Sequence, residues 1–521
     1  MTAEFDGHDR HALNGKLPRP QVTVQVLVIG AGPAGTAAAL AAARAGARVM
    51  LVDENPVSAG LMGLDTPLYF GGRMTSAVQR KERMLEQVFA ANPALEEAFE
   101  LGVDVALGTY AWGAFVNGPG LQTLPQPVVG LADEDRAWLV GFEKLILATG
   151  ARDIAMAFPG WDQPGVMGAN GLNALLTRYD AFAGRRIVVL GSGELGLSTA
   201  RLARSQGLEV AAIVDALDHP QAELGADLAE VPMLLGQVVH RAHGGIDGVE
   251  RIEVGPPGGP VQEIVCDTVC VAVGLAPAIE LFNAMGGALV AEGRRGGHAP
   301  QVTDGVRTSL ANVFVAGDCA GLAGGAERAE AQGVAAAQAA LGLPIEAVPE
   351  APAQDAWTYQ QEWMRALMAV GGDDVIVCQC EEVTRGDVLG VQPPNYLPRP
   401  PAIARRDIHT LLGDGPINQD QIKRLTRACM GACQARRCRE QVALTLACAT
   451  QAPPSAIPLA GFRAPVRPLP LKVLADWDEA EAMGEGWDVW FGIPSQWIPY
   501  QDIGTEREAM HRAVLGGDMH L

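Results

Sequence analysis

The feature that most restricts the fold of this chain is an apolar run followed by three spaced glycines, and it occurs twice. The first copy runs from Val22 to Ile29 and continues as Gly30-Ala-Gly-Pro-Ala-Gly35 into an alanine-rich stretch. The second runs from Arg185 to Leu190 and continues as Gly191-Ser-Gly-Glu-Leu-Gly196. Apolar runs of this length are typical of buried parallel strands, and the glycine spacing is typical of a tight turn that opens a helix. Each copy therefore predicts a strand, a turn and a helix.

The first copy is followed by the other parts of a nucleotide-binding unit. Its helix is expected to run through Ala45, and a second strand, Arg48–Val52, ends in two acids. In such a unit the first glycine permits the turn, the second lets the backbone approach a pyrophosphate, and the third lets the helix lie close to the strand. The helix N-terminus carries partial positive charge toward the phosphates, and an acid meets a ribose hydroxyl. The candidate residues are Gly30, Gly32, Pro33, Ala34, Gly35, Asp53 and Glu54. The spacing does not choose between the two acids.

The second copy predicts a second Rossmann-type unit, whose ligand the sequence leaves open. Its helix is expected to reach Gln206, and its next strand to end at Asp215. No arginine occurs between Ala216 and Leu224, so the 2′-phosphate of NADP would meet no cation there, and NADP is disfavoured. NAD or another adenine nucleotide in this unit and a retained but empty domain are equal alternatives, because a fold alone does not establish a ligand. The candidate residues are Gly191, Gly193 and Gly196.

Two further apolar runs end in polar turns. Leu145–Gly150 lies between the two copies, and Val313–Asp318 follows the second. A flavin lying across a sheet needs strand ends of this kind, one beside the middle of the cofactor and one that offers a carboxylate to the ribityl hydroxyls. The candidate residues are Ala148, Thr149, Gly150, Gly317 and Asp318.

Four cysteines near the C-terminus form two closely spaced pairs, Cys378 with Cys380 and Cys433 with Cys438. Thiolates bind iron strongly, and four of them complete the ligand set of a [2Fe-2S] cluster. The chain around the second pair is basic, which would offset part of the negative charge of such a cluster. Four thiolates would also hold zinc tetrahedrally, so zinc is the main alternative. Cys429 stands one helical turn before Cys433 and is interpreted as a non-ligand.

The other cysteines do not indicate a redox-active dithiol or a disulfide framework. Five of the nine lie between residues 378 and 438, and the rest are scattered. Cys266 and Cys270 are interpreted as core residues of a strand, and Cys319 as a small buried thiol next to Asp318. The nine histidines are dispersed, without an acid at readable spacing, and no catalytic residue is assigned.

The order of the first four motifs resembles the glutathione-reductase-like flavoproteins, in which a nucleotide domain is inserted into an FAD domain. The resemblance covers residues 22–343. It implies that Gly30, Gly32, Gly35 and the acid at Asp53 or Glu54 contact the FAD pyrophosphate and adenosine ribose. It also implies that Asp318 binds the ribityl chain. The C-terminal cysteine spacing is similar to a variant of the bacterioferritin-associated ferredoxin module, whose ligands correspond to Cys378, Cys380, Cys433 and Cys438.

Together with Phe158-Pro-Gly-Trp161 and Pro164-Gly-Val-Met167, these motifs resemble the large α-type subunits of one group of enzymes. The group comprises hydrogen cyanide synthase, opine oxidases, heteromeric proline and hydroxyproline dehydrogenases and, more distantly, sarcosine oxidase. The resemblance implies a partner subunit of D-amino-acid-oxidase type, an FMN between the subunits and a small ferredoxin-like [2Fe-2S] partner. A departure follows Pro56, where many relatives carry a Gly-Gly-Gln turn and this chain reads Val57-Ser-Ala-Gly-Leu-Met-Gly63.

Charge and hydropathy exclude several classes of partner. A net charge of −21 repels nucleic acid and anionic lipid surfaces, and no basic cluster offsets it. No uncharged apolar run reaches the length of a membrane span, and residues 1–20 lack the apolar core of a signal peptide. The sequence therefore predicts a cytoplasmic protein.

The expected fold class is an α/β flavoprotein with two dinucleotide-binding domains, followed by a small, mainly helical [2Fe-2S] module. The FAD-binding domain would comprise residues 22–160 and 291–343, with the second nucleotide domain, 161–290, inserted between them. The remaining segments are an N-terminal tail at 1–21, a proline-rich linker at 344–370, the cluster module at 371–460 and a tail at 461–521. This tail contains Trp477, Trp487, Trp490 and Trp497, which suggest either a subunit interface or packing on the FAD domain.

The expected function is electron transfer by a flavoprotein that forms part of a larger enzyme. Another subunit would oxidise the C–N bond of an amine or secondary amino acid, and this chain would relay the electrons through a flavin and a [2Fe-2S] cluster. Two alternatives are kept: a self-sufficient NADH-dependent flavin and iron–sulfur reductase, and a nucleotide-binding scaffold subunit without redox work. The substrate and the final electron acceptor are not assigned.

Overall fold

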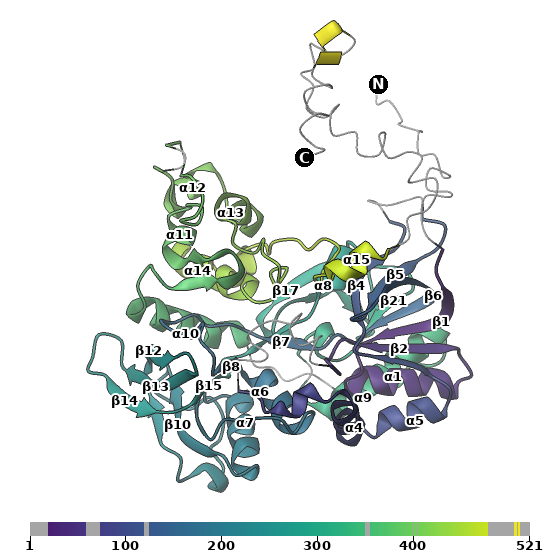
Figure 1. Ribbon diagram of the computed structural model, residues 1–521, viewed down its shortest axis with the longest axis horizontal. Coiled ribbons are helices and arrows are strands. Elements are labelled where there is room, and N and C mark those ends of the chain that lie inside the picture. The colour runs from purple at the N-terminus through teal and green to yellow at the C-terminus, as the bar shows by residue number, and fades with distance from the viewer. Residues whose placement is uncertain are drawn as a thin grey trace.

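The computed structural model describes residues 19–58, 73–118, 124–322, 324–349, 355–399, 401–402, 404–477, 505–507 and 509–510. In Figure 1 a first, mixed sheet with a parallel centre occupies the right of the view, a second, parallel sheet the lower left, and a group of C-terminal helices the upper left. The segment that departs from the family pattern after Pro56 lies largely outside the described residues.

The first sheet is built around β1 (Val22–Ile29), the strand expected from the first apolar run. It runs parallel to β2 (Val49–Asp53) and β6 (Ala137–Leu147), and β21 (Val313–Val315) pairs in parallel with β6. The other strands are β3 (Asp104–Leu107), β4 (Tyr110–Phe115), β5 (Val128–Ala132), β19 (Val302–Thr303) and β20 (Arg307–Thr308). The strand order is β19-β20-β21-β6-β1-β2-β3. The chain therefore leaves this sheet after β6 and returns to it at β19.

Two helices rich in alanine pack closely beside this sheet, α1 (Pro33–Arg44) and α9 (Ala326–Leu341). A Cβ atom on Gly333 of α9 would fall 2.0 Å from the carbonyl oxygen of Ala34. Only glycine at this position allows the two helices to approach so closely. The helices α4 (Lys81–Ala91), α5 (Ala94–Glu100) and α8 (Glu280–Ala284) complete this part of the chain.

The intervening segment forms a second parallel sheet with the strand order β11-β10-β9-β15-β8. These strands are β8 (Val166–Gly168), β9 (Arg186–Leu190), β10 (Glu209–Asp215), β11 (Met233–Leu235) and β15 (Thr268–Val271). Its helices are α6 (Ala169–Thr177) and α7 (Glu194–Ser205), and a three-stranded antiparallel sheet is formed by β12 (Val238–Gly245), β13 (Gly248–Gly255) and β14 (Gln262–Val265). Two antiparallel pairs remain, β7 (Ala151–Asp153) with β16 (Leu275–Pro277) and β17 (Leu289–Glu292) with β18 (Gly297–Pro300). Both strand–turn–helix predictions are thus confirmed.

The C-terminal part is mainly helical. Its elements are α10 (Ala356–Val370), β22 (Ile376–Cys378), β23 (Val383–Thr384), α11 (Arg385–Leu389), α12 (Ile408–Asp414), α13 (Gln419–Thr426), α14 (Arg439–Thr450) and α15 (Leu471–Ala475). The hydrophobic core that contains α14 also includes buried residues of the second sheet, so these parts of the molecule share one core.

Helix α10 differs from the sequence expectation, which placed residues 344–370 in a linker. Asp355 caps the helix by accepting a hydrogen bond from the amide of Trp357, and Trp363, Met364 and Leu367 are almost completely buried. Prolines occur at 344, 349 and 352, but the following apolar residues recur with helical spacing. The second half of the expected linker is therefore a packed helix.

Residues 461–477 lie against the first sheet. The amide of Val466 donates to the carbonyl of Trp112 at 2.7 Å, and the ring of Trp477 makes an edge-on contact with the ring of Trp112. Trp487, Trp490 and Trp497 lie outside the described residues, so the interface hypothesis for them stays a prediction.

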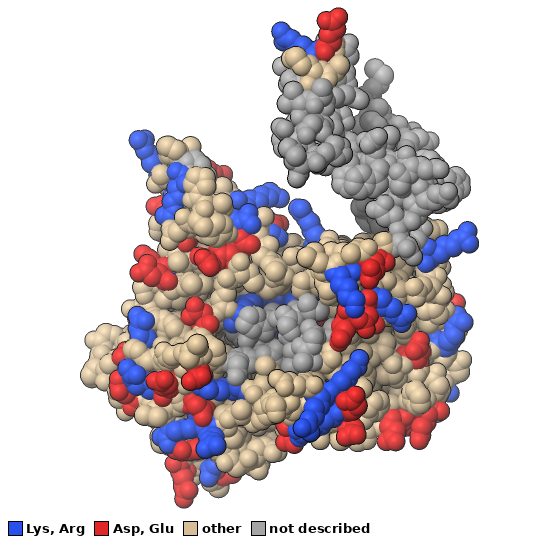
Figure 2. Space-filling model, in the orientation of Figure 1, with Lys and Arg blue, Asp and Glu red and all other residues tan. Residues whose placement is uncertain are grey.

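No helix in the described part of the chain is both long and apolar enough to cross a bilayer. Figure 2 shows acidic and basic side chains intermixed over the face in view. The excess of acids in the sequence is therefore spread between basic residues on this face rather than gathered in one acidic patch.

Candidate functional site

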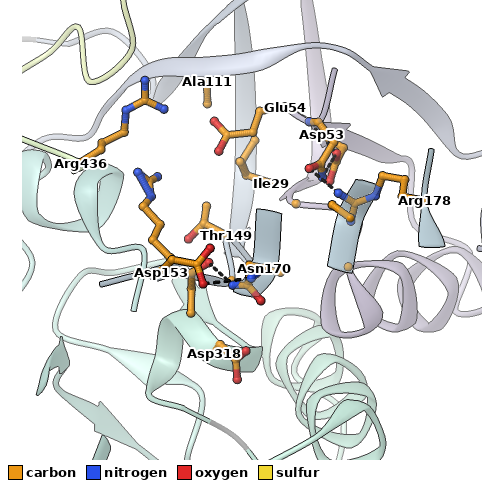
Figure 3. Close-up of a pocket in the computed structure, with 18 of the residues that line it drawn as sticks. Ile29, Asp53, Glu54, Ala111, Thr149, Asp153, Asn170, Arg178, Asp318 and Arg436 are labelled. Carbon is orange, nitrogen blue, oxygen red and sulfur yellow. Dashed lines mark hydrogen bonds between the residues drawn. The ribbon is translucent and has the colours of Figure 1, made fainter. Parts of the chain in front are cut away.

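A cavity of about 430 Å³ opens beside the carboxyl ends of β1, β2 and β6. Figure 3 shows that its walls come from segments far apart in the sequence. The sequence-predicted residues that line it are Gly30, Gly32, Pro33, Asp53, Glu54, Ala148, Thr149, Gly150 and Asp318. The structure therefore brings the first glycine turn, both acids and both strand-end motifs to one place.

The first glycine turn has the geometry of a phosphate-binding turn. Gly30 has a φ of +105°, and a Cβ atom there would lie 2.1 Å from the carbonyl oxygen of Ala148. A Cβ atom on Gly35 would lie 1.7 Å from the carbonyl oxygen of Gly30. A Cβ atom on Gly32 would meet no atom of the described residues within 4 Å. Gly30 and Gly35 are thus needed for close packing, while Gly32 leaves the backbone at the N-terminus of α1 open to a ligand.

The two acids after β2 have different contacts. One oxygen of Asp53 accepts a hydrogen bond from the amide of Ala31 at 2.7 Å, and the other accepts from the amide of Asn55 at 2.9 Å. Glu54 forms a bidentate ion pair with Arg467, at 2.5 and 3.0 Å. Asp53 therefore braces the turn, whereas Glu54 is tied to the C-terminal segment.

Burial by itself would raise the pKa of Glu54. The positive charge and hydrogen bonds of Arg467, with smaller contributions from Arg152 and Arg436, lower the pKa instead, to about 2. Glu54 is consequently ionised at neutral pH and can accept hydrogen bonds from hydroxyl groups in the cavity.

The two strand ends shape other parts of the cavity. The hydroxyl of Thr149 donates to the carbonyl of Ala278 at 2.7 Å and so joins this strand end to the chain after β16. Asp318 belongs to a 3-10 turn, Gly317–Ala320, in which Gly317 has a φ of +72°. In Figure 3 Asp318 and Glu54 lie on opposite sides of the cavity.

Asp153 lines the cavity and was not identified from the sequence. Its carboxylate accepts hydrogen bonds from the amides of Asn170 at 3.0 Å and Gly171 at 3.3 Å, in the first turn of α6 (Figure 3). Burial raises the pKa of Asp153 to about 7, although these amides lower it in part. Near neutral pH both protonation states are populated, so Asp153 can hold or release a proton at the cavity wall. In the sequence, only its position shortly after Gly150 indicates that Asp153 could belong to the site.

Five arginines also line the cavity: Arg152, Arg178, Arg436, Arg437 and Arg467. Arg152 forms an ion pair with the buried Glu280 at 3.2 Å. Arg436 and Arg437 stand between Cys433 and Cys438 in the sequence, where the basic composition was the only sign of a role. The loop between two candidate cluster ligands therefore forms part of the cavity wall.

The structure brings the four candidate metal ligands together, because Cys438 contacts Cys378 and Cys433, and Cys433 also contacts Cys380. The sulfur atoms of Cys378 and Cys438 are 3.6 Å apart. Cys380 and Cys433 share a hydrogen bond, which lowers the pKa of the Cys433 thiol. Cys378 and Cys438 are buried and Cys380 is exposed.

Cys429 is a fifth thiol at this place, with its sulfur 3.6 Å from that of Cys438. Its φ is +70°, in the left-handed region that favours glycine. Over the described residues no three Cys, His, Asp or Glu side chains are arranged to enclose a single metal ion. The thiols instead form a chain of contacts centred on Cys438, which touches Cys378, Cys429 and Cys433.

The remaining chemically active residues lie elsewhere. Cys266 and Cys270 are buried beside or within β15, and the Cys319 thiol donates to the carbonyl of Leu147 at 3.0 Å. The structure gives His243 an acid partner that sequence spacing did not show, because Glu253 faces it from the next strand, β13, at 2.9 Å. The second glycine turn, with Gly191, Gly193 and Gly196, lies in the second sheet and is not part of this cavity wall.

Comparisons with known proteins agree with this architecture. The chain is 28% identical to an opine oxidase subunit from Agrobacterium tumefaciens (strain Ach5), over 86% of this chain and 91% of the relative. It is 32% identical to the alpha subunit of sarcosine oxidase from Rhizobium meliloti (strain 1021), over 59% of this chain but only 30% of that longer protein. The crystal structure of L-proline dehydrogenase from P. horikoshii has a similar fold, with a TM-score of 0.59, 21% identity and coverage of 88% of this chain and 81% of that one.

These relatives confirm the resemblance inferred from the motifs. The family model described as pyridine nucleotide-disulphide oxidoreductase matches residues 24–341, which include both of the larger sheets. This chain belongs to the pyridine nucleotide-disulphide oxidoreductase family.

Proposed function

We propose that this chain is the FAD- and [2Fe-2S]-containing electron-transfer subunit of a heteromeric dehydrogenase or oxidase. The enzyme would act on the C–N bond of an amine or secondary amino acid. One observation carries the proposal: Arg436 and Arg437, between the candidate cluster ligands Cys433 and Cys438, line the cavity built by the nucleotide-binding motifs. A flavin and a cluster bound at these two places would be separated by a single loop.

Membership in this family implies FAD binding, and the residues that line the cavity are of the kinds that would hold the dinucleotide. The backbone of Gly30, Gly32, Pro33, Ala34 and Gly35, at the N-terminus of α1, would hold the pyrophosphate. Asp53 and Glu54 would meet the adenosine ribose, and Gly317 and Asp318 the ribityl chain, with Ala148, Thr149 and Gly150 beside the middle of the cofactor. Bound FAD supplies the ability to take up a hydride and to release its electrons one at a time.

The thiol donors fit an iron–sulfur cluster held by Cys378, Cys380, Cys433 and Cys438. Arg437 supports this assignment, because it is only 6% exposed and its Nε and Nη1 atoms have no hydrogen-bond partner among the described residues. Burial lowers the pKa of Arg437 to about 10, while Cys433, Cys380 and Cys438 act in the opposite direction. A buried cation beside the thiols would offset part of the charge of a thiolate-bound cluster. Zinc at the same ligands is the competing proposal.

The relatives support a role within a complex, since both are named as subunits of oxidases. We propose that a partner of D-amino-acid-oxidase type oxidises the substrate, that an FMN lies between the two subunits, and that a small ferredoxin-like [2Fe-2S] protein is a further partner.

Co-purification with the partner subunit tests the proposal. The complex should oxidise secondary amino acids or related amines with an artificial electron acceptor, and this chain alone should not. In the complex, substrate should bleach the flavin absorbance and reduce the cluster within the time of one turnover. Amine oxidation by the isolated chain would contradict the assignment, as would a complex whose cluster stays oxidised while substrate is consumed.

A further inference from the structure

The two glycine turns of this chain have the same internal geometry. The amide of Ala31 donates to Asp53 at 2.7 Å, and the amide of Ser192 donates to Asp215, also at 2.7 Å. The first glycine of the second turn, Gly191, has a φ of +115°, close to that of Gly30 in the first. Both turns are therefore built to carry a dinucleotide pyrophosphate and an acid for its ribose.

Their surroundings differ, because helix α10 crosses the second turn. The hydroxyl of Tyr359 donates to Oδ2 of Asp215 at 2.6 Å and accepts a hydrogen bond from the amide of Ser192 at 3.1 Å. A Cβ atom on Gly191 would lie 3.2 Å from the same hydroxyl oxygen. The ring of Tyr359 also lies 3.9 Å from the place of a Cβ atom on Gly193, whereas no described atom lies within 4 Å of the same place on Gly32, which lines the cavity of the first turn.

The groups that would recognise a nucleotide in the second turn already have protein partners. Asp215 and Ser192 are completely buried. Oδ2 of Asp215 accepts from the hydroxyl of Ser192 at 2.6 Å in addition to the Tyr359 hydroxyl. The contact of Oδ1 with the amide of Leu217 at 3.0 Å is the counterpart of that between Asp53 and Asn55, so the two turns differ in the hydroxyl donors at Oδ2. A ribose hydroxyl would have to displace these donors, and losing a buried hydrogen bond is unfavourable.

Tyr359 is held in place by the packing of its helix. Trp363, Met364 and Leu367, farther along α10, are at most 2% exposed, and the hydroxyl of Thr445 in α14 contacts the sulfur of Met364 at 3.5 Å. Burial and the neighbouring Asp215 raise the pKa of Tyr359, so its hydroxyl remains a donor over the physiological range. Opening the turn would require removing these apolar side chains from the core.

We propose that Tyr359 replaces the dinucleotide in the second unit, and that this unit binds neither NAD(H) nor NADP(H). The residues present do not fit a nicotinamide dinucleotide there, although the fold would allow one. Tyr359 thereby determines which electron donor the chain can use, since electrons cannot enter it from a nicotinamide at this site. The inference goes beyond the proposed function and argues against the NADH-dependent reductase alternative.

Titration of the purified full-length chain with NADH, followed by nicotinamide fluorescence and by calorimetry, tests the proposal. The wild type should show no saturable binding. Tyr359→Ala, which removes the phenol, should gain saturable binding of NADH or ADP-ribose, with a Kd about tenfold or more below the highest concentration at which the wild type shows none. Tyr359→Phe is the matched control: it loses the hydroxyl, but its ring still covers the turn, so it should gain less than Tyr359→Ala.

The proposal would be overturned if the wild type bound NADH saturably and the Gly193→Asp substitution abolished that binding. Gly193 has a φ of −74° at the N-cap of α7, so aspartate fits its backbone and would repel a pyrophosphate. A Tyr359→Ala protein that keeps the wild-type flavin content and melting temperature, yet binds NADH no better, would also overturn the role of Tyr359. Neither result depends on iron or on a partner subunit. A failure of this proposal can therefore be distinguished from a failure of the proposed function.

Discussion

Arg467 and Glu54 form a bidentate ion pair across 413 positions of the sequence, with Nε of Arg467 at 2.5 Å from Oε2 of Glu54. The pair joins the C-terminal segment to the acid beside the nucleotide cavity. The arginine side chain is 8% exposed and that of the glutamate 38% exposed, so the pair lies at the edge of the solvent rather than deep in the core.

We expect Arg467→Gln to lower the free energy of unfolding at neutral pH. Breaking a fully buried pair costs about 3–5 kcal/mol, but the exposure of Glu54 reduces the expected loss to about 1–2 kcal/mol. Because the pKa of Glu54 is lowered from 4.5 to about 2 in the folded chain, this stabilisation is complete above 4.5 and is lost as pH falls toward 2. Denaturant unfolding at neutral and acid pH measures both effects.

Lys472→Gln is the control for Arg467→Gln, because Lys472 pairs with Asp135 in the same segment but both side chains are exposed. Solvent screens an exposed pair of this kind, so its removal should leave the free energy of unfolding almost unchanged. Equal losses in the two variants, or a loss in Arg467→Gln that does not shrink at acid pH, would contradict the account.

Asp153 should make the chain less stable as pH rises. Its pKa is raised from 3.8 to about 7 in the folded state, so the folded chain holds a proton that the unfolded chain has lost between those values. Stability should therefore fall from about pH 4 to about pH 7 and level off above that. Asp153→Asn should flatten this slope. Its altered hydrogen bonds would change the stability by the same amount at every pH and so would not affect the slope. Melting temperatures across this range, with the same slope in both proteins, would exclude Asp153 as the cause.

Gly32→Asp should abolish flavin binding while the chain stays folded. Gly32 is the N-cap of α1 with a φ of −72°, and a side chain there meets no described atom within 4 Å, so aspartate fits the backbone. Its charge would stand where the pyrophosphate is expected and would repel it. Absorbance after purification should show no flavin bands, with an unchanged far-ultraviolet circular dichroism spectrum. A variant that retains stoichiometric FAD would place the flavin elsewhere.

The cysteines should separate into ligands and non-ligands by their effect on iron. Cys378→Ser and Cys438→Ser each remove one sulfur of the 3.6 Å pair and should lose most of the bound iron. Cys448→Ser is the control, because Cys448 is in the same part of the chain and its sulfur contacts the carbonyl of Gln361 instead. Cys429→Ala should retain the iron. Loss of iron in Cys429→Ala with retention in Cys378→Ser would show that Cys429 is the true ligand.

The nucleotide-binding turns could be predicted because their determinants are local. Glycine spacing and apolar runs placed β1, α1, β9 and α7 to within about two residues, since the turn geometry depends only on neighbouring residues. The convergence of cysteines from residues 378–380 and 433–438 could be anticipated from their number and type alone, because two closely spaced pairs of thiols are typical of a metal or cluster site.

Other parts of the site depend on long-range packing and could not be predicted. Nothing near Glu54 in the sequence indicates Arg467, and the basic residues at Arg436 and Arg437 suggested only a charge beside the thiols, not a cavity wall. Tyr359 lies in a segment whose nearby prolines suggested a linker, so its contact with Asp215 became visible only with the packing of α10. The difference in contacts between Asp53 and Glu54 likewise became visible only with their hydrogen-bond partners.

The central claim is that one chain holds a flavin and an iron–sulfur cluster joined by the loop at residues 433–438. The most direct test is the visible and EPR spectrum of the purified chain before and after dithionite, with iron, sulfide and zinc measured on the same sample. We expect flavin bands, a rhombic EPR signal in the reduced state and about two irons per chain. Zinc in place of iron, with no signal after reduction, would contradict it.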